Sequence, residues 1–461
     1  MHSGERSIPF ASSGSYPVRA GNAVRPLIDG EPAFRRICEA VEAARHSVWV
    51  TVAWIWEAFR MPDGRGSLFD VLDAAAARGI DVRVIFYRHT AEGPFPRQII
   101  FSGTAEQRLW LENRGSRFYA RWDSTPVWSF HHQKSWIIDA GHETEVAFVG
   151  GMNMRPSTVA PRGHVSLDGK SQDHDAYIEI AGPSATDVHH NFVQRWNEAS
   201  ERHQDDGVFG HLRDDMLPLP TRLSPSRGSV VAQIQRTIPN GHYAEGAWAL
   251  SEVAYDIAAG EFSVAEQYGH AIDAARRTIY IENQAFSSIA MLERLKRALE
   301  RGVQVAAVVP VQGEHHMRRF RELSEHRPLF DLIAACGSHD NFTLAGLAGP
   351  MPDGSRGNVY IHGKLMLVDD VFATIGSTNF ADRSFLSQTE MNVSFQDAAE
   401  VRALRCDLFA EHTGYDTAGM GDAEALRLFA VTARANAARR AAGETSWQGI
   451  VFALDPATYA S

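Results

Sequence analysis

The chain has 461 residues, of which 44% are hydrophobic and 22% are charged, and its formal net charge is −11. This balance is typical of a globular protein and excludes a disordered or fibrous chain, and the length suffices for two domains or one large pseudo-symmetric unit. The acidic charge argues against a protein that binds nucleic acid through a broad basic surface. Three cysteines without a Cys-x-x-Cys pair exclude a disulfide framework and favour a reducing compartment.

Residues 1–24 are expected to form an N-terminal extension. They lack the basic head and apolar core of a secretory signal. No apolar run in the chain reaches the roughly 18 to 20 residues that a membrane-spanning helix needs. We therefore expect a cytoplasmic protein without a transmembrane segment, while peripheral membrane contact and non-classical export stay open.

Residues 25–199 are predicted to form a first half of β-α-β type. Residues 33–56 indicate a helix and then a strand, and residues 68–88 repeat that order, with an Arg-Gly helix stop before a Val-x-Val strand. A strand with polar residues follows in "FHHQKSWIIDA" (130–140). The stretch "EVAFVGGMN" (145–153) predicts another strand, which ends in glycine.

Residues 200–229 are rich in Pro, Gly, Ser and charge, and we expect them to form a linker. Residues 230–415 then repeat the order of the first half, with helix–strand stretches at 271–286 and 291–311. The second polar strand and its glycine turn lie within residues 359–379.

The remaining residues, 416–461, are predicted to be a C-terminal helical segment, with an amphipathic packing helix at 422–442. The alternation of strands and helices in both halves implies an α/β fold. We expect two similar β-α-β halves packed as a pseudo-twofold unit, each a mixed sheet flanked by helices.

Each polar strand carries a histidine, a lysine and an aspartate at the spacing H-x-K-x4-D. The two sets are His132, Lys134 and Asp139, and His362, Lys364 and Asp369. Since the chain holds only four lysines, two such motifs are not expected by chance. Residues i and i+2 of a strand share a face, so each histidine lies beside its lysine. The aspartates, seven residues after the histidines, point to the opposite face and are expected to hold the next turn through backbone N–H groups.

An asparagine follows small residues beyond each motif, at Asn153 and Asn379. If the halves face each other, the paired histidines, lysines and asparagines suit a tetrahedral phosphate. One neutral imidazole would attack phosphorus to form a phosphohistidine, and the other would protonate the leaving alcohol. Each ring also needs a carboxylate on its other nitrogen. Asp175 and Glu390, at matching places after the asparagine turns, are the candidates.

A metal site is the alternative for paired histidines. The lysine beside each motif histidine repels a cation, and no carboxylate or cysteine lies at ligand spacing. We therefore expect neither a metal nor another cofactor.

With these residues, the chain resembles the phospholipase D superfamily, which is defined by paired H-x-K-x4-D motifs. The resemblance covers roughly residues 25–415 and extends to "HDAYIEIAGPSATDVHHNFVQRWN" (174–197) and "IQRTIP" (234–239). It implies that His132 is the nucleophile and His362 the acid/base. The candidate catalytic residues are then His132, His362, Lys134, Lys364, Asp139 and Asp369, and the candidate phosphate-binding residues are Asn153, Asn379 and Ser377.

The resemblance implies a phospholipase D-type phosphodiesterase. It would hydrolyse the distal phosphodiester bond of a glycerophospholipid of the phosphatidylcholine or phosphatidylethanolamine class, through a phosphohistidine, with transfer to alcohols as a second outcome. The expected partner is a phospholipid at a membrane or micelle surface, bound by a monomer without nucleic acid. The alternatives are a superfamily nuclease and a cardiolipin-synthase-like phosphatidyltransferase. An inactive scaffold is disfavoured because neither motif lacks its histidine or lysine.

Two further features have an ordinary structural explanation beside a functional one. Residues 313–327, dense in His and Arg, favour a solvated helix face over a rim for anionic headgroups. Four tryptophans near the motifs favour core packing over an acyl pocket. They are Trp54, Trp56, Trp128 and Trp136.

Overall fold

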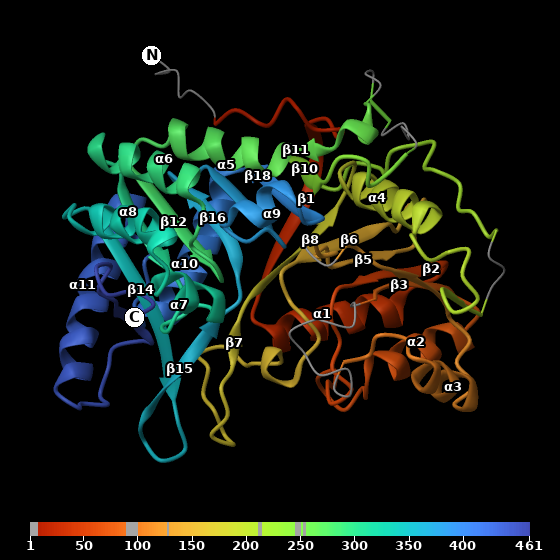
Figure 1. Cartoon of the computed structure of the whole chain (residues 1–461), viewed down its shortest axis with the longest axis horizontal. Helices are drawn as coiled ribbons and strands as arrows, with labels where there is room; N and C mark the ends of the chain where they lie inside the picture. Colours follow the sequence, from red (N-terminus) through yellow and green to blue (C-terminus); the bar gives the residue numbers. More distant parts are fainter. Residues whose placement is uncertain (1–7, 89–99, 127–128, 211–213, 245–249, 252–254) are drawn as a thin grey trace.

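Two lobes of similar construction lie side by side in the computed structural model (Figure 1). The structure describes residues 8–88, 100–126, 129–210, 214–244, 250–251 and 255–461. The first lobe holds strands β1 to β9 and the second holds β10 to β19. Strand β1 (Arg19–Ile28) joins the two sheets, because it pairs antiparallel with both β8 (Ala176–Ala181) and β10 (Val230–Ile238).

The sheet of the first lobe runs in the order β1–β8–β6–β5–β2–β3–β4–β9. Its other strands are β2 (Ser47–Val52), β3 (Asp81–Tyr87), β4 (Tyr119–Asp123), β5 (Ser135–Ile138), β6 (Val146–Gly150) and β9 (Val208–Phe209). The central three, β2, β3 and β4, are parallel, and the remaining pairs are antiparallel. The sheet is therefore mixed, as expected from the sequence.

The second lobe repeats this arrangement in the order β10–β18–β17–β16–β12–β13–β14. Its strands are β12 (Thr278–Asn283), β13 (Gln304–Val308), β14 (Phe342–Pro350), β16 (Lys364–Val368), β17 (Phe372–Gly376) and β18 (Glu390–Gln396). Both β15 (Arg356–Ile361) and β19 (Val451–Ala453) add to β14, and β11 (Glu261–Phe262) adds to β10. The α/β prediction with two similar halves is confirmed.

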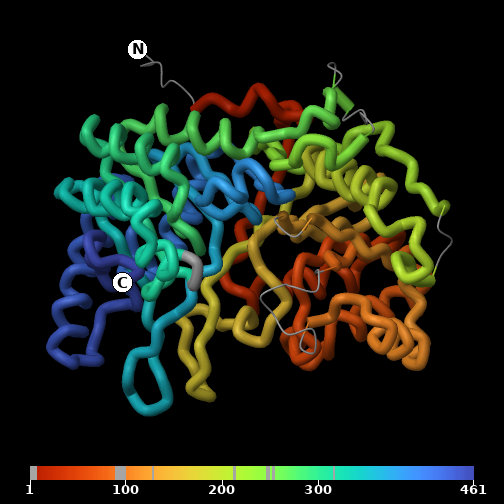
Figure 2. Tube along the Cα trace, in the orientation of Figure 1, coloured from red at the N-terminus to blue at the C-terminus, as the bar shows by residue number. Residues whose placement is uncertain are grey.

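Each lobe contains a third parallel strand that the sequence analysis did not predict, β4 in the first lobe and β14 in the second. The stretch "YARWD" of β4 has charged residues among its apolar ones, so its pattern is weak. Residues 200–229 also differ from a free linker, because β9 lies within them and pairs with β4. In the trace of Figure 2 this yellow-green segment follows the outer side of the first lobe.

Helices cover the sheets on both faces. Those of the first lobe are α1 (Gly30–Ala43), α2 (Leu68–Ala77), α3 (Ala105–Asn113) and α4 (Ala185–Glu198). Those of the second are α5 (Ser263–Ala274), α6 (Ile289–Glu300), α7 (His315–Arg321), α8 (Arg327–Gly337), α9 (Asp382–Leu386), α10 (Ala398–Thr413) and α11 (Asp422–Ala441). Helix α11 matches the packing helix predicted at 422–442. No helix among the described residues is both long and apolar enough to cross a membrane.

One hydrophobic core joins the two lobes. It contains Ile178 and Phe192 of the first lobe together with Val393 and Phe409 of the second. Each lobe also has a core of its own beneath its outer helices. Since the central core draws side chains from both sheets, the lobes share the burial that stabilises them.

The motif aspartates hold the turns after the motif strands. Asp139 accepts main-chain N–H groups from residues 45–47 at 2.7–3.3 Å, and Asp369 accepts those of residues 276–278 at 2.8–2.9 Å. Both residues adopt the left-handed region, with φ of 56° and 55°, which aspartate tolerates. They therefore tie each motif strand to the start of its neighbour, as the strand parity predicts. This position corrects their inclusion among the catalytic residues, because neither lies in the cavity described below.

We predict that Asp369→Ala lowers the free energy of unfolding by about 2 kcal/mol, because three main-chain N–H groups lose a charged acceptor. Urea denaturation followed by circular dichroism measures this change. Asp353→Ala is the matched control, since exposed Asp353 accepts the N–H of Ser355 in a hairpin tip, and it should produce a clearly smaller change. Equal effects of the two substitutions would contradict the proposed stabilisation of the turn by Asp369.

Candidate active site

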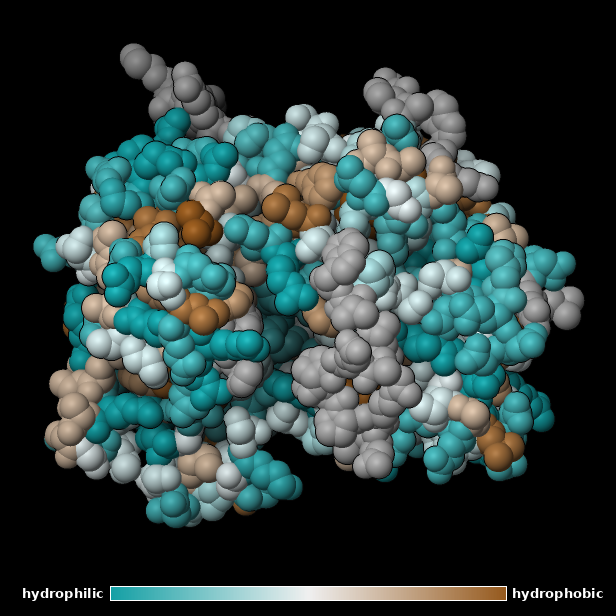
Figure 3. Space-filling model, in the orientation of Figure 1, coloured by the Kyte–Doolittle hydropathy of each residue, from teal (hydrophilic) through white to brown (hydrophobic). Residues whose placement is uncertain are grey.

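A cavity of about 560 Å³ opens between the two lobes and contains both motif histidines. The first lobe contributes His132 and Asn153 to its wall, and the second contributes His362 and Asn379. Near the middle of the face in Figure 3, a hollow opens whose visible walls are mostly hydrophilic. The residues predicted to converge from the two halves thus meet at one site.

The main chain of each motif histidine pairs with the opposite lobe. The N–H of His132 donates to the carbonyl of Thr389 at 3.0 Å, and the N–H of His362 donates to that of His174 at 2.8 Å. These partners come directly before Glu390 and Asp175, the two candidate carboxylates. The regular motif strands begin only at Ser135 and Lys364, later than predicted, because the chain before them pairs across the lobes.

The side chains pair crosswise as well. Nδ1 of His132 lies 3.0 Å from both carboxylate oxygens of Glu390, and Nδ1 of His362 lies 2.5 Å from Oδ2 of Asp175. The carboxylates are 0% and 1% exposed. Each lobe therefore supplies the carboxylate that orients the imidazole of the other lobe, and neither lobe alone contains a complete pair.

Burial governs protonation at these pairs. It lowers the pKa of His132 to about 4, although the nearby Glu390 carboxylate raises that pKa in part. Burial, with the ammonium of Lys364, holds the pKa of His362 well below its usual value. Both imidazoles are accordingly neutral at pH 7. A neutral ring that donates Nδ1–H to a carboxylate carries its lone pair on Nε2, the nitrogen that a nucleophile or base uses.

The two motif lysines lie behind the histidines. Nζ of Lys134 donates to the carbonyl of His132 at 2.7 Å and lies 5.5 Å from the ring centre of Trp54. Nζ of Lys364 donates to the carbonyl of His362 and to Oε1 of Gln284, the latter at 2.8 Å. Burial lowers the pKa of Lys134 well below its usual value and that of Lys364 to about 8. Both amines are therefore held next to the rings in a poorly solvated place.

The predicted phosphate-binding residues do not all reach the cavity. Nδ2 of Asn153 lies 3.3 Å from Nε2 of His362, and Asn379 lines the wall from the turn after β17. Ser377 is fully buried and donates to Oε2 of Glu390 at 2.5 Å. Its assignment to phosphate binding is therefore corrected. Ser377 holds the carboxylate that orients His132.

Two arginines of the wall were missed by the sequence analysis. Arg155 donates to Asp173 at 2.5 Å and stacks on Tyr360, with 4.9 Å to the ring centre. Arg383 stacks on Phe130 at 5.2 Å. Each follows the asparagine of its lobe by two or four residues, and that position is the only sequence signal that could have indicated them.

Trp54 and Trp56 also line the cavity, against the expectation of simple core packing, whereas Trp136 is fully buried. Trp128 lies outside the described residues. Glu314 of the basic stretch 313–327 reaches the wall, and burial raises its pKa. Arg318 and Arg319 of that stretch are exposed, in line with a solvated helix face.

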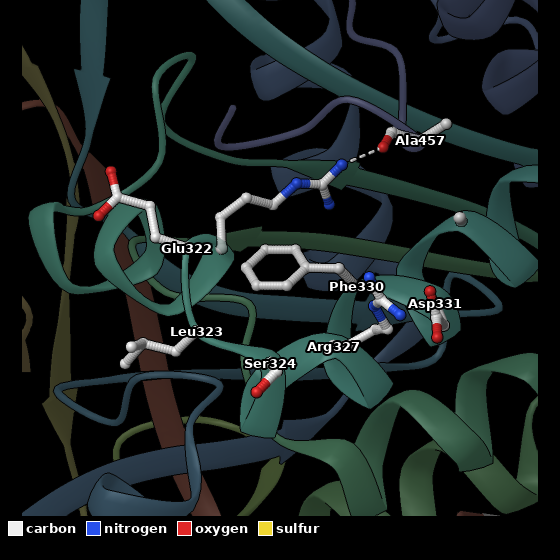
Figure 4. A pocket seen from close by; sticks show the side chains of 9 residues that line it. Glu322, Leu323, Ser324, Arg327, Phe330, Asp331 and Ala457 are labelled. Atoms are coloured by element: carbon white, nitrogen blue, oxygen red, sulfur yellow. Dashed lines mark hydrogen bonds between the residues drawn. The ribbon is translucent and has the colours of Figure 1, made fainter.

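A second hollow, of about 370 Å³, lies beside α8 and contains none of the motif residues (Figure 4). Its wall includes Leu323, Ser324, Arg327, Phe330, Asp331 and Ala457. Arg321 already crosses it, because it stacks on Phe330 at 4.7 Å and donates to the carbonyl of Ala457. Its residues offer no nucleophile paired with a base, so the cavity between the lobes is the candidate site.

Comparison with protein families agrees with this geometry. The family described as "Cardiolipin synthase, PLD-like domain" matches residues 37–196 and 268–410, about two thirds of the chain, and the family described as "Phospholipase D" matches residues 157–303. The chain belongs to the phospholipase D superfamily. The first of these matches includes both motif histidines.

Similar proteins include phospholipase D A of Dictyostelium discoideum, 25% identical over 82% of this chain and 33% of that protein. Cardiolipin synthase A of Pseudomonas entomophila (strain L48) is 25% identical over 84% of this chain and 67% of that protein. The chain thus spans a third of the first relative and about two thirds of the second. The crystal structure of phosphatidylserine synthase from Haemophilus influenzae Rd KW20 has the same fold, with a TM-score of 0.52 at 15% identity over 85% of this chain and 88% of that one.

We predict that the imidazole of His132 stays neutral at pH 7 and titrates near its pKa of about 4. Nuclear magnetic resonance of ¹⁵N-histidine-labelled protein measures this, with His132→Asn to assign the signal. Glu390→Gln should lower the pKa further, because the carboxylate raises it. A His132 ring that is protonated at pH 7 would overturn this description of the site.

Proposed function

We propose that this member of the superfamily is a phosphatidyl-transferring phosphodiesterase. It cleaves the distal phosphodiester bond of a glycerophospholipid, keeps the phosphatidyl group on a histidine, and passes it to water or to an alcohol. The crossed imidazole–carboxylate pairs carry the proposal, because they present two oriented imidazoles from opposite lobes to one cavity. That arrangement suits in-line displacement at one phosphorus atom.

In the first step, Nε2 of neutral His132 attacks phosphorus, and the bond from phosphorus to the headgroup oxygen breaks. His362 supplies the proton that the headgroup oxygen takes up as it leaves. The negative phosphate favours the protonated form of His362, and Asp175 stabilises that imidazolium from Nδ1. The products of this step are the free headgroup alcohol and phosphatidyl-His132.

In the second step, His362 takes a proton from water or an alcohol. The oxygen of that acceptor attacks phosphorus, and the bond from phosphorus to Nε2 of His132 breaks. Water gives phosphatidic acid, and an alcohol gives a new phosphatidyl ester. Asn153, Asn379, Lys134 and Lys364 are the proposed donors to the phosphate oxygens, and the lysines reach them by turning away from the histidine carbonyls.

A cationic headgroup, choline or ethanolamine, fits the wall best. Trp54, Trp56 and Tyr360 place aromatic rings on the wall, and the ring faces that Arg155 and Lys134 leave open attract quaternary and primary ammonium groups. Asp173 and Glu314 add carboxyl groups to the same wall. We therefore place phosphatidylcholine and phosphatidylethanolamine first among the substrates.

Transfer of the phosphatidyl group to phosphatidylglycerol, as in cardiolipin synthesis, is the second candidate. The match to the cardiolipin synthase family over both lobes favours it. The two candidates share the phosphohistidine and differ in the headgroup and the acceptor. The reaction products therefore distinguish the two candidate functions, whereas active-site variants do not.

Products from three kinds of vesicle test the proposal: phosphatidylcholine with phosphatidylethanolamine, the same lipids with ethanol, and phosphatidylglycerol alone. Mass spectrometry should find phosphatidic acid with free headgroup in the first, and phosphatidylethanol in the second. If phosphatidylglycerol vesicles yield cardiolipin and the phosphatidylcholine and phosphatidylethanolamine vesicles yield no phosphatidic acid, the second candidate is favoured. Cleavage of DNA with no lipid product would reject both.

We predict that His132→Ala and His362→Ala each lower kcat/KM for the preferred lipid by about 1,000-fold or more, because each removes one reacting group. Release of headgroup in an enzyme-coupled assay measures this loss. The control is His270→Ala on α5, which lies far from the motifs in the sequence and does not line the cavity, and should keep full activity. Near-full activity of either motif variant would reject the mechanism.

We also predict a bell-shaped dependence of kcat/KM on pH with its maximum between about 7 and 8. Burial raises the pKa of Asp175 to about 7, so the rate rises as this carboxyl loses its proton and begins to support His362. Lys364, with a pKa of about 8, loses its charge above that value, and the rate falls. Asp175→Asn should remove the acidic limb and lower the maximum. An acidic limb that persists in this variant would assign it to another group.

A further inference from the structure

A group of buried histidines and carboxylates lies outside the cavity, where segments of both lobes meet. Asp29 precedes α1, His164 and His174 lie in the chain before β8, and Glu411 comes from α10 of the second lobe. Nδ1 of His174 and Nε2 of His164 lie 2.8 and 3.2 Å from Oδ1 of Asp29, and 3.2 Å from each other. Oε1 of Glu411 lies 3.7 Å from Nε2 of His164.

We propose that Asp29, His164, His174 and Glu411 bind a first-row divalent metal ion, with zinc as the best match. A zinc ion at about 2.0–2.1 Å from four tetrahedral ligands leaves the ligand atoms about 3.3 Å apart. Four of the six separations in this group are 2.8 to 3.7 Å and bracket that value, and all six lie within 4.8 Å. Two imidazole nitrogens and two carboxylate oxygens form a donor set that suits zinc.

The surroundings of His174 give independent support. Its second nitrogen, Nε2, lies 3.0 Å from Oε2 of Glu282, and Tyr280 donates to the other oxygen of Glu282 at 2.6 Å. A histidine that binds a metal through one nitrogen usually donates its other N–H to a carboxylate, which fixes the ring. Glu411 is held in a comparable way, because Nη2 of Arg162 lies 3.0 Å from Oε2 of Glu411.

The charges of the group also favour a divalent cation. The carboxylates of Asp29, Glu282 and Glu411 bring three negative charges, against which Arg162 brings one positive charge. Imidazoles bind a metal ion in their neutral form, and a divalent ion bound to them would make the group neutral, whereas buried uncompensated charge is costly. Oδ2 of Asp29 and Nδ1 of His164 have no hydrogen-bond partner among the described residues, so hydrogen bonds alone do not satisfy the group.

A second buried group gives a contrast within the same chain. Asp123, His131 and His242 also converge, but Nε of Arg195 lies 2.9 Å from Oδ2 of Asp123. The guanidinium of Arg195 therefore supplies the positive charge that a metal ion would bring to this group. No arginine or lysine lies at hydrogen-bond distance from Asp29 among the described residues, and its Oδ1 faces two imidazoles instead.

Four protein ligands leave no open position, so the ion is structural rather than catalytic. It joins α10 of the second lobe to the residue before α1 and to strand β7 (Asp173–His174) in the first. The carbonyl of His174 accepts the N–H of His362, and residue 175 is the carboxylate on that ring. The ion thus fixes the segment that orients His362 without contacting the reacting atoms.

The test uses the full chain, dialysed against a chelator and then titrated with Zn²⁺ by calorimetry, with metal content measured by mass spectrometry. We expect one zinc ion per chain and a higher melting temperature on binding. His164→Asn should weaken zinc affinity by about 100-fold, and Glu282→Gln by about 10-fold to 100-fold. His242→Asn, in the contrasting group, should leave affinity unchanged.

Glu411→Gln keeps the size of the side chain and tests the same site if His164→Asn fails to fold. Circular dichroism identifies folded variants. Wild-type protein that binds no Zn²⁺, or folded His164→Asn and Glu411→Gln proteins that bind it as the wild type does, would overturn the proposal. Neither outcome bears on lipid cleavage, because no ligand of the ion is a reacting group.

Discussion

Two buried imidazole–carboxylate pairs, each formed across the boundary between the lobes, are the interaction on which the rest of the structure depends. A carboxylate at 0% or 1% exposure is unfavourable without a partner, and removal of one member of a buried pair typically costs about 3–5 kcal/mol. Glu390 pairs with a ring of the first lobe, and Asp175 pairs with a ring of the second. Association of the lobes is therefore required both for stability and for the chemistry.

The remainder of the fold supports that association. Strand β1 pairs with both sheets, and the central core takes side chains from both lobes, so neither sheet can shift without disturbing the other. Aspartates 139 and 369 hold the turns at the far ends of the motif strands. The histidines lie directly before these strands, and their main chains are fixed by hydrogen bonds to the opposite lobe, which suits the precise positioning of reacting groups.

Much of this could be predicted from the sequence, because the repeat of H-x-K-x4-D is local and its strand parity is fixed by covalent geometry. The expectation that the aspartates hold the next turns agrees with their main-chain contacts, although the motif had grouped them with the catalytic residues. Ser377 was misassigned because its hydroxyl turns toward Glu390, a contact set by a strand pairing. Strand β4 was missed because its apolar pattern is short, and β14 was missed because glycines and a proline, which are depleted in strands, interrupt its apolar residues.

By itself, the sequence determined that two similar α/β halves exist, that each contributes a histidine, a lysine and an asparagine, and that the chain resembles one superfamily. Only the tertiary structure decided which carboxylate serves which histidine, that the lysines lie behind the rings, and that Asp29, His164, His174 and Glu411 meet. The reason is physical. A motif specifies positions along one strand, whereas partners separated by 187 to 258 residues are chosen by how the two sheets pack.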